Sequence, residues 1–261
     1  MLSISNYIDE INKKGGKALS VFLTAGFPGK ENFVNLALQI LNAGADMLEI
    51  GFPFSDPLAD GPVIQHSSQA ALDNGISLDD AFRFAKEIKS NSGKPVIMMG
   101  YANPVLSYGL KEFSDHAGNA GVNGVIIPDI PIEEYENFFD GSFENLDKIL
   151  LVTPTTPDER INVIDEMSSG FVYCVSVSGT TGSKLNDKSE SIEFIKRARS
   201  TVKKNKLLVG FGISSGEDAK AFAPYCDGVI VGSAVIKSLM QDDGEYDKTI
   251  ELIAGIKKNL L

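Results

Sequence analysis

Positive charge is scarce in this sequence. Its 261 residues include 24 Lys and Arg against 35 Asp and Glu, which gives a net charge of −11. Surfaces that bind nucleic acid or anionic membranes need clustered Lys and Arg, so we expect neither as a partner. The first ten residues lack the basic and apolar segments of a signal peptide, and no run approaches the ~18 apolar residues that span a membrane. We therefore expect a cytoplasmic protein.

Cysteine and histidine are also rare, with two of each. Cys174 and Cys226 lie in separate apolar runs, so we expect buried, inert thiols rather than a metal site. His66 and His116 are far apart in the sequence, which argues against a metal centre or a His-based catalytic triad. We predict no metal ion on this chain.

The sequence does contain enough apolar material for a large core. Hydrophobic residues make up 43% of the chain, and area scaling implies that roughly 70% of the unfolded surface is buried on folding. No Pro-, Gly- or Ser-rich linker divides the chain. We therefore predict a single domain over residues 1–261.

Short apolar runs alternate with amphipathic stretches along the whole chain. Each run has the length and β-branched content of a strand that is buried on both faces. The eight runs are Ala18–Leu23, Met47–Ile50, Pro95–Met99, Gly124–Ile127, Ile149–Val152, Phe171–Val177, Leu207–Phe211 and Gly228–Val231.

The stretches between the runs have helical spacing. The apolar face from Leu78 to Ile88, for example, follows a capping box formed by Ser77 and Asp80. Eight strands that alternate with helices in about 250 residues predict an α/β fold, a single (β/α)8 TIM barrel. An extra N-terminal helix over residues 4–11 precedes the first strand and is expected to plug the barrel floor. A doubly wound sheet is the alternative fold.

Glu49 lies within the second run. Strand alternation sends Leu48 and Ile50 to one face, so Glu49 points into the barrel if that aliphatic pair packs on helices. Basic residues occur only at the starts of the other runs, which leaves no cation in mid-strand to pair with it. An unpaired carboxyl in an apolar pocket has a raised pKa, so we predict a general acid or base. A carboxylate held by a buried Lys or Arg is the structural alternative.

Two loops after strands are candidates for carrying chemistry. Residues 51–62, GFPFSDPLADGP, contain three prolines and two glycines, which would hold the carboxylates of Asp56 and Asp60 in fixed positions. The alternative is that both carboxylates only cap the turn or face solvent. The small, polar stretch 178–184 follows the sixth run and is either a lid over a ligand or a surface loop without a role.

Glycine-containing turns follow the last two runs. Gly210 and Gly212 flank the end of the seventh run, and Gly232 and Ser233 follow the eighth and open a short helix. Barrels often bind phosphate at these two places through backbone N–H groups and a helix N-terminus. We predict a phosphate site built without Lys or Arg, while the alternative is that these glycines merely turn the chain.

Taken together, these segments resemble the tryptophan synthase α-subunit family. The matching motifs occur in the family's order over nearly the whole chain, and PFSDPLADGP is the most specific of them. The motifs are FLTAG at 22–26, LEIG at 48–51, PFSDPLADGP at 53–62, YANP at 101–104, PDIP at 128–131, PTTPD at 154–158, GFGI at 210–213 and GSA at 232–234.

The resemblance implies retro-aldol cleavage of indole-3-glycerol phosphate to indole and glyceraldehyde 3-phosphate. Glu49 matches the residue that protonates the indole ring carbon, and Asp60 matches the carboxylate that accepts a hydrogen bond from the indole N–H. Gly100 stands where a larger residue is expected, which would alter the pocket wall. The implied pocket residues are Phe22, Ile64, Met99, Tyr101, Asp129, Tyr173 and Thr181. The implied phosphate contacts are Gly182, Gly210, Gly212, Gly232 and Ser233.

The resemblance also implies a partner, a β subunit in an α2β2 assembly, that carries pyridoxal phosphate and receives the indole. No cofactor is expected on this chain. The expected partner surface consists of Phe54, Ser55, Asp56, Asn103 and Pro131. A free-standing indole-3-glycerol-phosphate lyase and a non-catalytic regulatory barrel remain alternatives. Related phosphate-binding barrels use a catalytic Lys or an Asp/Cys pair at strand ends, and no Lys lies at the carboxyl end of any predicted strand.

Overall fold

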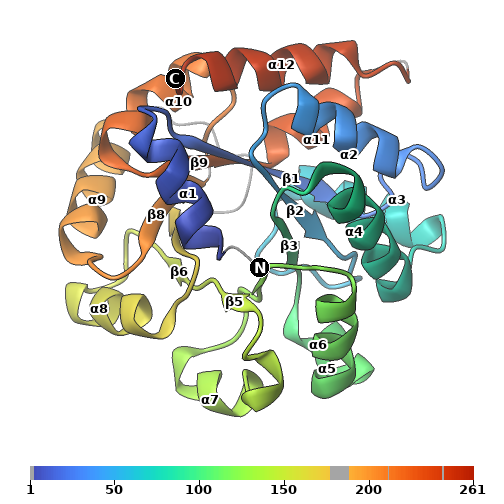
Figure 1. Cartoon of the computed structure of the whole chain (residues 1–261), viewed down its shortest axis with the longest axis horizontal. Coiled ribbons are helices and arrows are strands. Elements are labelled where there is room, and N and C mark those ends of the chain that lie inside the picture. Colours follow the sequence, from blue (N-terminus) through green and yellow to red (C-terminus); the bar gives the residue numbers. More distant parts are fainter. Residues whose placement is uncertain (1–2, 177–187, 211, 243) are drawn as a thin grey trace.

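Parallel strands form one continuous sheet that curls into a barrel (Figure 1). The computed structural model describes residues 3–176, 188–210, 212–242 and 244–261. Within them the sheet order is β5-β4-β3-β2-β1-β9-β8-β7-β6. The strands are β1 (Ala18–Thr24), β2 (Met47–Gly51), β3 (Val96–Met99), β4 (Gly124–Ile126), β5 (Asp147–Lys148), β6 (Leu151–Val152), β7 (Phe171–Val175), β8 (Lys206–Gly210) and β9 (Gly228–Val231).

The fifth predicted strand is divided into two short pieces. β5 pairs with β4 on one side, and β6 pairs with β7 on the other. Between them, the Ile149 N–H donates to the Val125 carbonyl at 3.0 Å, and the Tyr173 N–H donates to the Leu150 carbonyl at 2.9 Å. One stretch of chain therefore supplies both edges of the sheet, and the prediction of a (β/α)8 barrel is confirmed.

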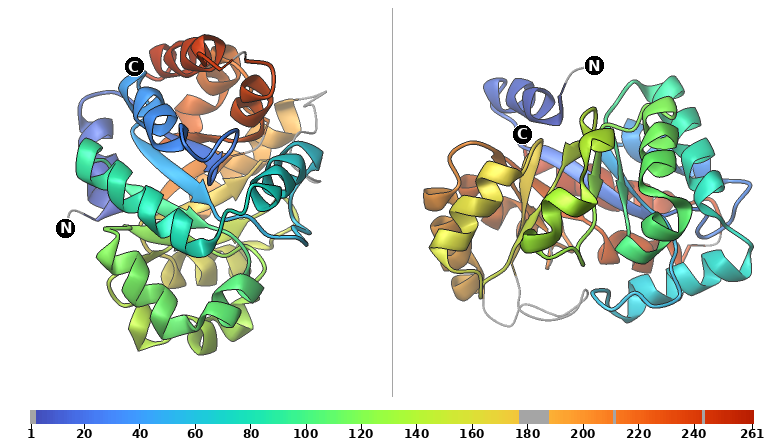
Figure 2. Two further views of the ribbon diagram at one scale, coloured as in Figure 1. Left: turned by 90° about the vertical axis from the view of Figure 1, so that its right-hand side faces the viewer. Right: turned by 90° about the horizontal axis from the view of Figure 1, so that it is seen from below.

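Helices surround the sheet, as two further views show (Figure 2). The capping box predicted at Ser77 and Asp80 is present at the start of α4. No helix in the described part of the chain is long and apolar enough to cross a bilayer. The helices are α1 (Ile4–Lys13), α2 (Phe33–Asn42), α3 (Pro62–Asp73), α4 (Leu78–Ser92), α5 (Ala102–Tyr108), α6 (Leu110–Asn119), α7 (Tyr135–Phe138), α8 (Asp158–Met167), α9 (Lys188–Thr201), α10 (Gly216–Phe222), α11 (Ser233–Leu239) and α12 (Asp247–Lys258), with 3-10 turns at Ile132–Glu134, Gly141–Phe143 and Ala223–Tyr225.

Helix α1 closes one end of the barrel (Figure 2). Ile4 and Ile8 are fully buried and join the apolar cluster inside the barrel, which includes Met47, Ile97 and Phe171. A second and larger cluster lies between the outer faces of the strands and the surrounding helices. The expected plug is therefore present, and it seals the end at which the strands begin.

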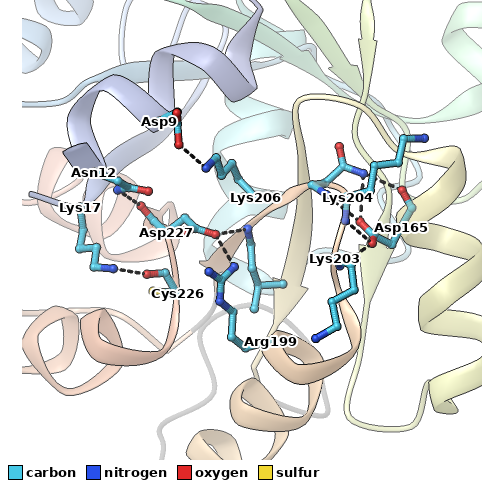
Figure 3. Close-up of polar contacts among 12 residues, drawn as sticks. Asp9, Asn12, Lys17, Asp165, Arg199, Lys203, Lys204, Lys206, Cys226 and Asp227 are labelled. Carbon is cyan, nitrogen blue, oxygen red and sulfur yellow. Dashed lines mark hydrogen bonds and ion pairs between the residues drawn. The ribbon is translucent and has the colours of Figure 1, made fainter.

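Carboxylates at this floor hold the backbone in place (Figure 3). Asp227 accepts hydrogen bonds from the Leu207 N–H and from Arg199, both at 2.8 Å. Asp165 accepts from the backbone N–H groups of residues 203–205 at distances of 2.7 to 3.0 Å. These acidic side chains have structural partners at the floor, whereas functional sites in such barrels lie at the opposite end, where the strands finish.

Candidate active site

A pocket opens at the carboxyl ends of the strands, and it collects most of the predicted site residues. Leu151 of β6 and Ile230 of β9 also line it, so the wall draws on both halves of the sheet. The predicted catalytic, substrate and phosphate residues that line it are Phe22, Glu49, Asp60, Ile64, Met99, Tyr101, Tyr173, Gly212, Gly232 and Ser233. Thr181 and Gly182 lie outside the described residues.

Glu49 points into the barrel from β2 and is fully buried. It lies beside Phe22 of β1 in the strand register. Its Oε1 accepts a hydrogen bond of 2.7 Å from the Ser20 hydroxyl, whereas its Oε2 is buried without a hydrogen-bond partner among the described residues. No Lys, Arg or His is among the described residues that line the pocket.

Burial raises the pKa of Glu49 to about 7, and the hydrogen bond from Ser20 opposes that rise only in part. A carboxyl in this state exchanges its proton near neutral pH, which is what a general acid requires. The structural alternative, a carboxylate paired with a buried cation, is not what the described part of the pocket contains.

Asp60 lies on the long loop after β2, and Tyr101 holds it in place. The Tyr101 hydroxyl donates to Asp60 Oδ2 at 2.8 Å and accepts from the Ala59 N–H at 3.0 Å. Burial raises the pKa of Asp60, and the bond from Tyr101 acts in the opposite direction. Asp60 therefore faces the pocket instead of capping its own turn, whereas Asp56 is exposed and accepts from the Ser55 hydroxyl.

Tyr173 reaches across the barrel toward the same carboxyl groups. Burial raises its pKa well above the usual value, and the charges of Glu49 and Asp60 add to that effect. Its ring lies so close to Gly210 that a Cβ at that position would be 2.3 Å from the hydroxyl oxygen. Gly210 therefore makes room for Tyr173, and it does not itself line the pocket.

The two glycine turns meet at one side of the pocket. Gly212 has a φ of +75°, a left-handed conformation that favours glycine. Gly232 precedes α11, and Ser233 is the first residue of that helix. Because Gly212, Gly232 and Ser233 line a single pocket, the two turns can offer backbone and hydroxyl groups to the same small anion.

Two predicted features of the wall differ from expectation. Asp129 is exposed and lies at the mouth, where its carboxylate accepts from the Ala102 N–H at 2.9 and 3.2 Å and so caps α5. Gly100 leaves no empty space, because a Cβ there would be 2.1 Å from the Phe52 ring. Phe52 thus fills the volume that a larger residue at position 100 was expected to occupy.

The contacts of two serines, Ser20 and Ser68, were not predicted. Ser20 contacts Glu49, and Ser68 fixes Phe54 of the loop by accepting from its N–H at 3.0 Å and donating to its carbonyl at 3.1 Å. The sequence marks Ser20 as a polar residue in an apolar run with the same strand parity as Phe22, but it does not give the strand register on which the contact with Glu49 depends. Ser68 lies on α3, and no pattern in the sequence marks its contact with the loop.

The chain is similar to known proteins over nearly its whole length. The family model described as "Tryptophan synthase alpha chain" matches residues 8–259. The chain belongs to this family. A tryptophan synthase alpha chain of Petrotoga mobilis is 43% identical over 248 residues, which is 95% of this chain and 96% of the relative. One of Christiangramia forsetii is 40% identical and covers 91% of this chain and 93% of its own length.

Solved structures agree with this assignment. The structure of Mycobacterium tuberculosis tryptophan synthase aligns with a TM-score of 0.91 at 32% identity, over 100% of this chain and 99% of that chain. The alpha chain from Legionella pneumophila aligns with a TM-score of 0.89 at 33% identity, over 100% and 97%. The barrel of this chain is therefore the fold of its family.

Three of the residues expected to face a β subunit, Phe54, Asp56 and Asn103, lie at the mouth of the pocket. Ser55, Asp56, Asn103 and Pro131 are exposed, and Phe54 is half-buried. A second, shallower depression beside the active site is lined by Phe54, Asp56, Leu58, Ala59, Tyr101, Asn103 and Asp129. Leu58, which lines this depression, is 90% exposed.

Proposed function

We propose that this chain cleaves indole-3-glycerol phosphate to indole and glyceraldehyde 3-phosphate, with Glu49 as the general acid. The observation that carries the proposal is a fully buried carboxyl whose pKa is raised to about 7, in a pocket whose described lining holds no cation. Membership of the tryptophan synthase alpha chain family supports the reaction itself.

The reaction needs a proton on the ring before the carbon–carbon bond can break. Glu49 transfers its proton to the ring carbon that bears the side chain, which places positive charge on the indole nitrogen. The bond to the side chain then breaks, and its electron pair restores the aromatic ring. The hydroxyl on the departing carbon loses its proton as the aldehyde forms, and the Glu49 carboxylate, which gave its own proton to the ring, takes it up and is restored as the acid.

Asp60 supports this step as an electrostatic partner. A carboxylate that accepts a hydrogen bond from the indole N–H stabilises the positive charge that develops on the ring. The hydroxyl of Tyr101 already donates to the same carboxylate, and both donors favour its charged form. The apolar side chains of Phe22, Ile64 and Met99 line the pocket and are suited to hold the indole ring.

The phosphate end of the substrate is assigned to the two glycine turns. Gly212, Gly232 and Ser233 would bind it through backbone N–H groups and a hydroxyl, and Gly210 shapes the first turn. We extend the site to Gly182 and assign Thr181 to a lid over the substrate, on the basis of the family resemblance alone. An anion bound by amides suits a protein with a net charge of −11.

The test is indole release by the Glu49→Gln variant. General acid catalysis contributes ~10²–10⁴-fold, so we expect the variant to lose at least that factor in kcat, measured with purified substrate. Asp60→Asn should also release indole more slowly than the unaltered protein. Glu112→Gln, an exposed change on α6, is the matched control and should keep full activity. Near-normal indole release by Glu49→Gln would contradict the proposed role.

We further propose a β-subunit partner in an α2β2 assembly in the cytoplasm, with pyridoxal phosphate on the partner. The name alpha chain implies such a partner. Two alternatives are separated from this proposal by supplying substrate with and without a β subunit and measuring indole and glyceraldehyde 3-phosphate. A free-standing lyase would release indole without stimulation by the partner. A regulatory barrel would release none in either arm.

A further inference from the structure

A serine inside the barrel contacts the carboxyl group of Glu49. Ser20 and Glu49 are both fully buried, and Ser20 Oγ donates to Glu49 Oε1 at 2.7 Å. In the register of β1 and β2, Phe22 lies beside Glu49, and Ser20 is two residues before Phe22 on the same face of its strand. The contact is therefore built into the two neighbouring strands and needs no loop to form it.

The two oxygens of Glu49 have different surroundings. Oε1 accepts from Ser20, whereas Oε2 is buried and has no hydrogen-bond partner among the described residues. A neutral carboxyl carries its hydrogen on one oxygen and accepts on the other. Since Oε1 already accepts, Oε2 is the oxygen that carries the hydrogen.

The other titratable groups facing this carboxyl are few. Tyr173 of β7 and the Asp60–Tyr101 pair at the mouth line the same pocket, and no Lys, Arg or His does so within the residues described. Both Tyr173 and Tyr101 have raised pKa values and are neutral near pH 7. Ser20 is therefore the hydrogen-bond donor that the structure places on Glu49.

We propose that Ser20 is a positioning residue for the acid, which holds Oε1 and leaves Oε2 as the oxygen that carries the transferable proton. This inference rests on the proposed function of Glu49. Because the hydroxyl favours the charged carboxylate, it also limits how far burial raises the pKa of Glu49. The proton is thus kept transferable as well as correctly placed.

The test is the pH dependence of Ser20→Ala in indole release. Loss of a hydrogen bond to a charged group should lower kcat by roughly tenfold and change KM less. Activity needs the protonated acid, so it falls as the pH rises through the pKa of Glu49. Removing Ser20's donor raises that pKa, and the falling limb should move to higher pH. Ser20→Thr keeps the hydroxyl, so its falling limb should lie at the same pH as that of the unaltered protein.

Ser114→Ala is the matched control for the loss of a buried serine hydroxyl. Ser114 is 5% exposed and donates to the Ser142 carbonyl, away from the pocket lining. Ser114→Ala should leave the pH profile of indole release unchanged. An unshifted limb in Ser20→Ala overturns the inference, whatever happens to kcat.

Two further variants keep the result decisive. If Ser20→Ala does not fold, Ser20→Cys replaces the hydroxyl with a weaker donor of similar shape, and its limb should move in the same direction. An unshifted limb in Ser20→Cys would then overturn the inference. Glu49→Gln separates the two proposals, because an active Glu49→Gln removes the proposed function. An inactive Glu49→Gln with an unshifted serine variant removes only the role of Ser20.

Discussion

Glu49 illustrates how burial changes the ionisation of a single residue. Its ordinary pKa is 4.5, and burial raises it to about 7 in the folded chain. Between these two values the folded protein keeps a proton that the unfolded chain releases. The free energy of unfolding therefore falls as the pH rises across that window, by about 3 kcal/mol in total, and the loss is complete above pH 7.

Glu49→Gln should therefore be more stable than the unaltered protein at pH 8. The neutral amide does not acquire a buried charge, so we expect the gain to approach about 3 kcal/mol at pH 8 and to vanish near pH 4, where both side chains are neutral. Urea unfolding at several pH values measures it, with Glu112→Gln as the exposed control. A difference that stays constant with pH would contradict the pKa assigned to Glu49.

Tyr101 is a second residue whose hydroxyl can be tested by deletion. Tyr101→Phe removes the donor to Asp60 and the acceptor for the Ala59 N–H. We expect kcat/KM to fall roughly tenfold or more, since a hydrogen bond to a charged group contributes about 1.5–3 kcal/mol. Tyr108→Phe, on the outer helix α5, removes a hydroxyl bonded to Asp79 and should leave indole release unchanged. Equal kinetics for the two variants would show that Tyr101 does not position Asp60.

At the scale of elements, hydrophobic periodicity was sufficient to predict most of the fold. Runs buried on both faces are long and apolar, so seven of the eight predicted strands agree with the structure to within two residues over the described part of the chain. The fifth was misplaced in part, because β5 consists of the polar pair Asp147 and Lys148. These residues pair through their backbone, which side-chain patterning does not reveal.

Parts of the site could not be predicted for a related reason. Glu49 was predicted because a carboxyl in an apolar run is visible in the sequence. The rigid acidic loop offered Asp56 and Asp60 alike, and the family resemblance distinguished Asp60. The contact of Ser20 with Glu49 depends on the register of two strands, and the filling of space at Gly100 by Phe52 depends on packing between a loop and a strand. Neither register nor packing follows from spacing along one chain.

Helix α1 offers an element-scale test of the barrel floor. Ile8 is fully buried against the interior, whereas Ile11 is only partly buried. Ile8→Ala should lower the free energy of unfolding by about 2–5 kcal/mol, and Ile11→Ala by clearly less, both measured by urea denaturation. The folded Ile8→Ala protein should still release indole, since the pocket lies at the other end. A similar loss for both variants would show that α1 does not pack as a plug.

At the scale of the whole molecule, the mouth of the pocket coincides with the surface expected to meet a β subunit. Asp56→Ala should reduce stimulation by that subunit far more than it changes the KM for the substrate, because this carboxylate is exposed on the rim. Indole release with and without the β subunit measures the effect. Asp115→Ala, an exposed change on α6, is the control. Unchanged stimulation of Asp56→Ala would count against this surface.

Residues 147–152 are joined to the neighbouring strands over short lengths only. Two register pairs join this stretch to each neighbouring strand, the same number as between β8 and β9, whereas β1 and β2 share five. The stretch is also divided into two pieces of two residues each. Few backbone hydrogen bonds have to break for the strands to separate here. We therefore expect amide hydrogen exchange to begin in residues 147–152. Separation of residues 147–152 from a neighbouring strand would convert the closed barrel into an open, curved sheet. The Ser20–Glu49 pair, on the strands that share five register pairs, would stay intact.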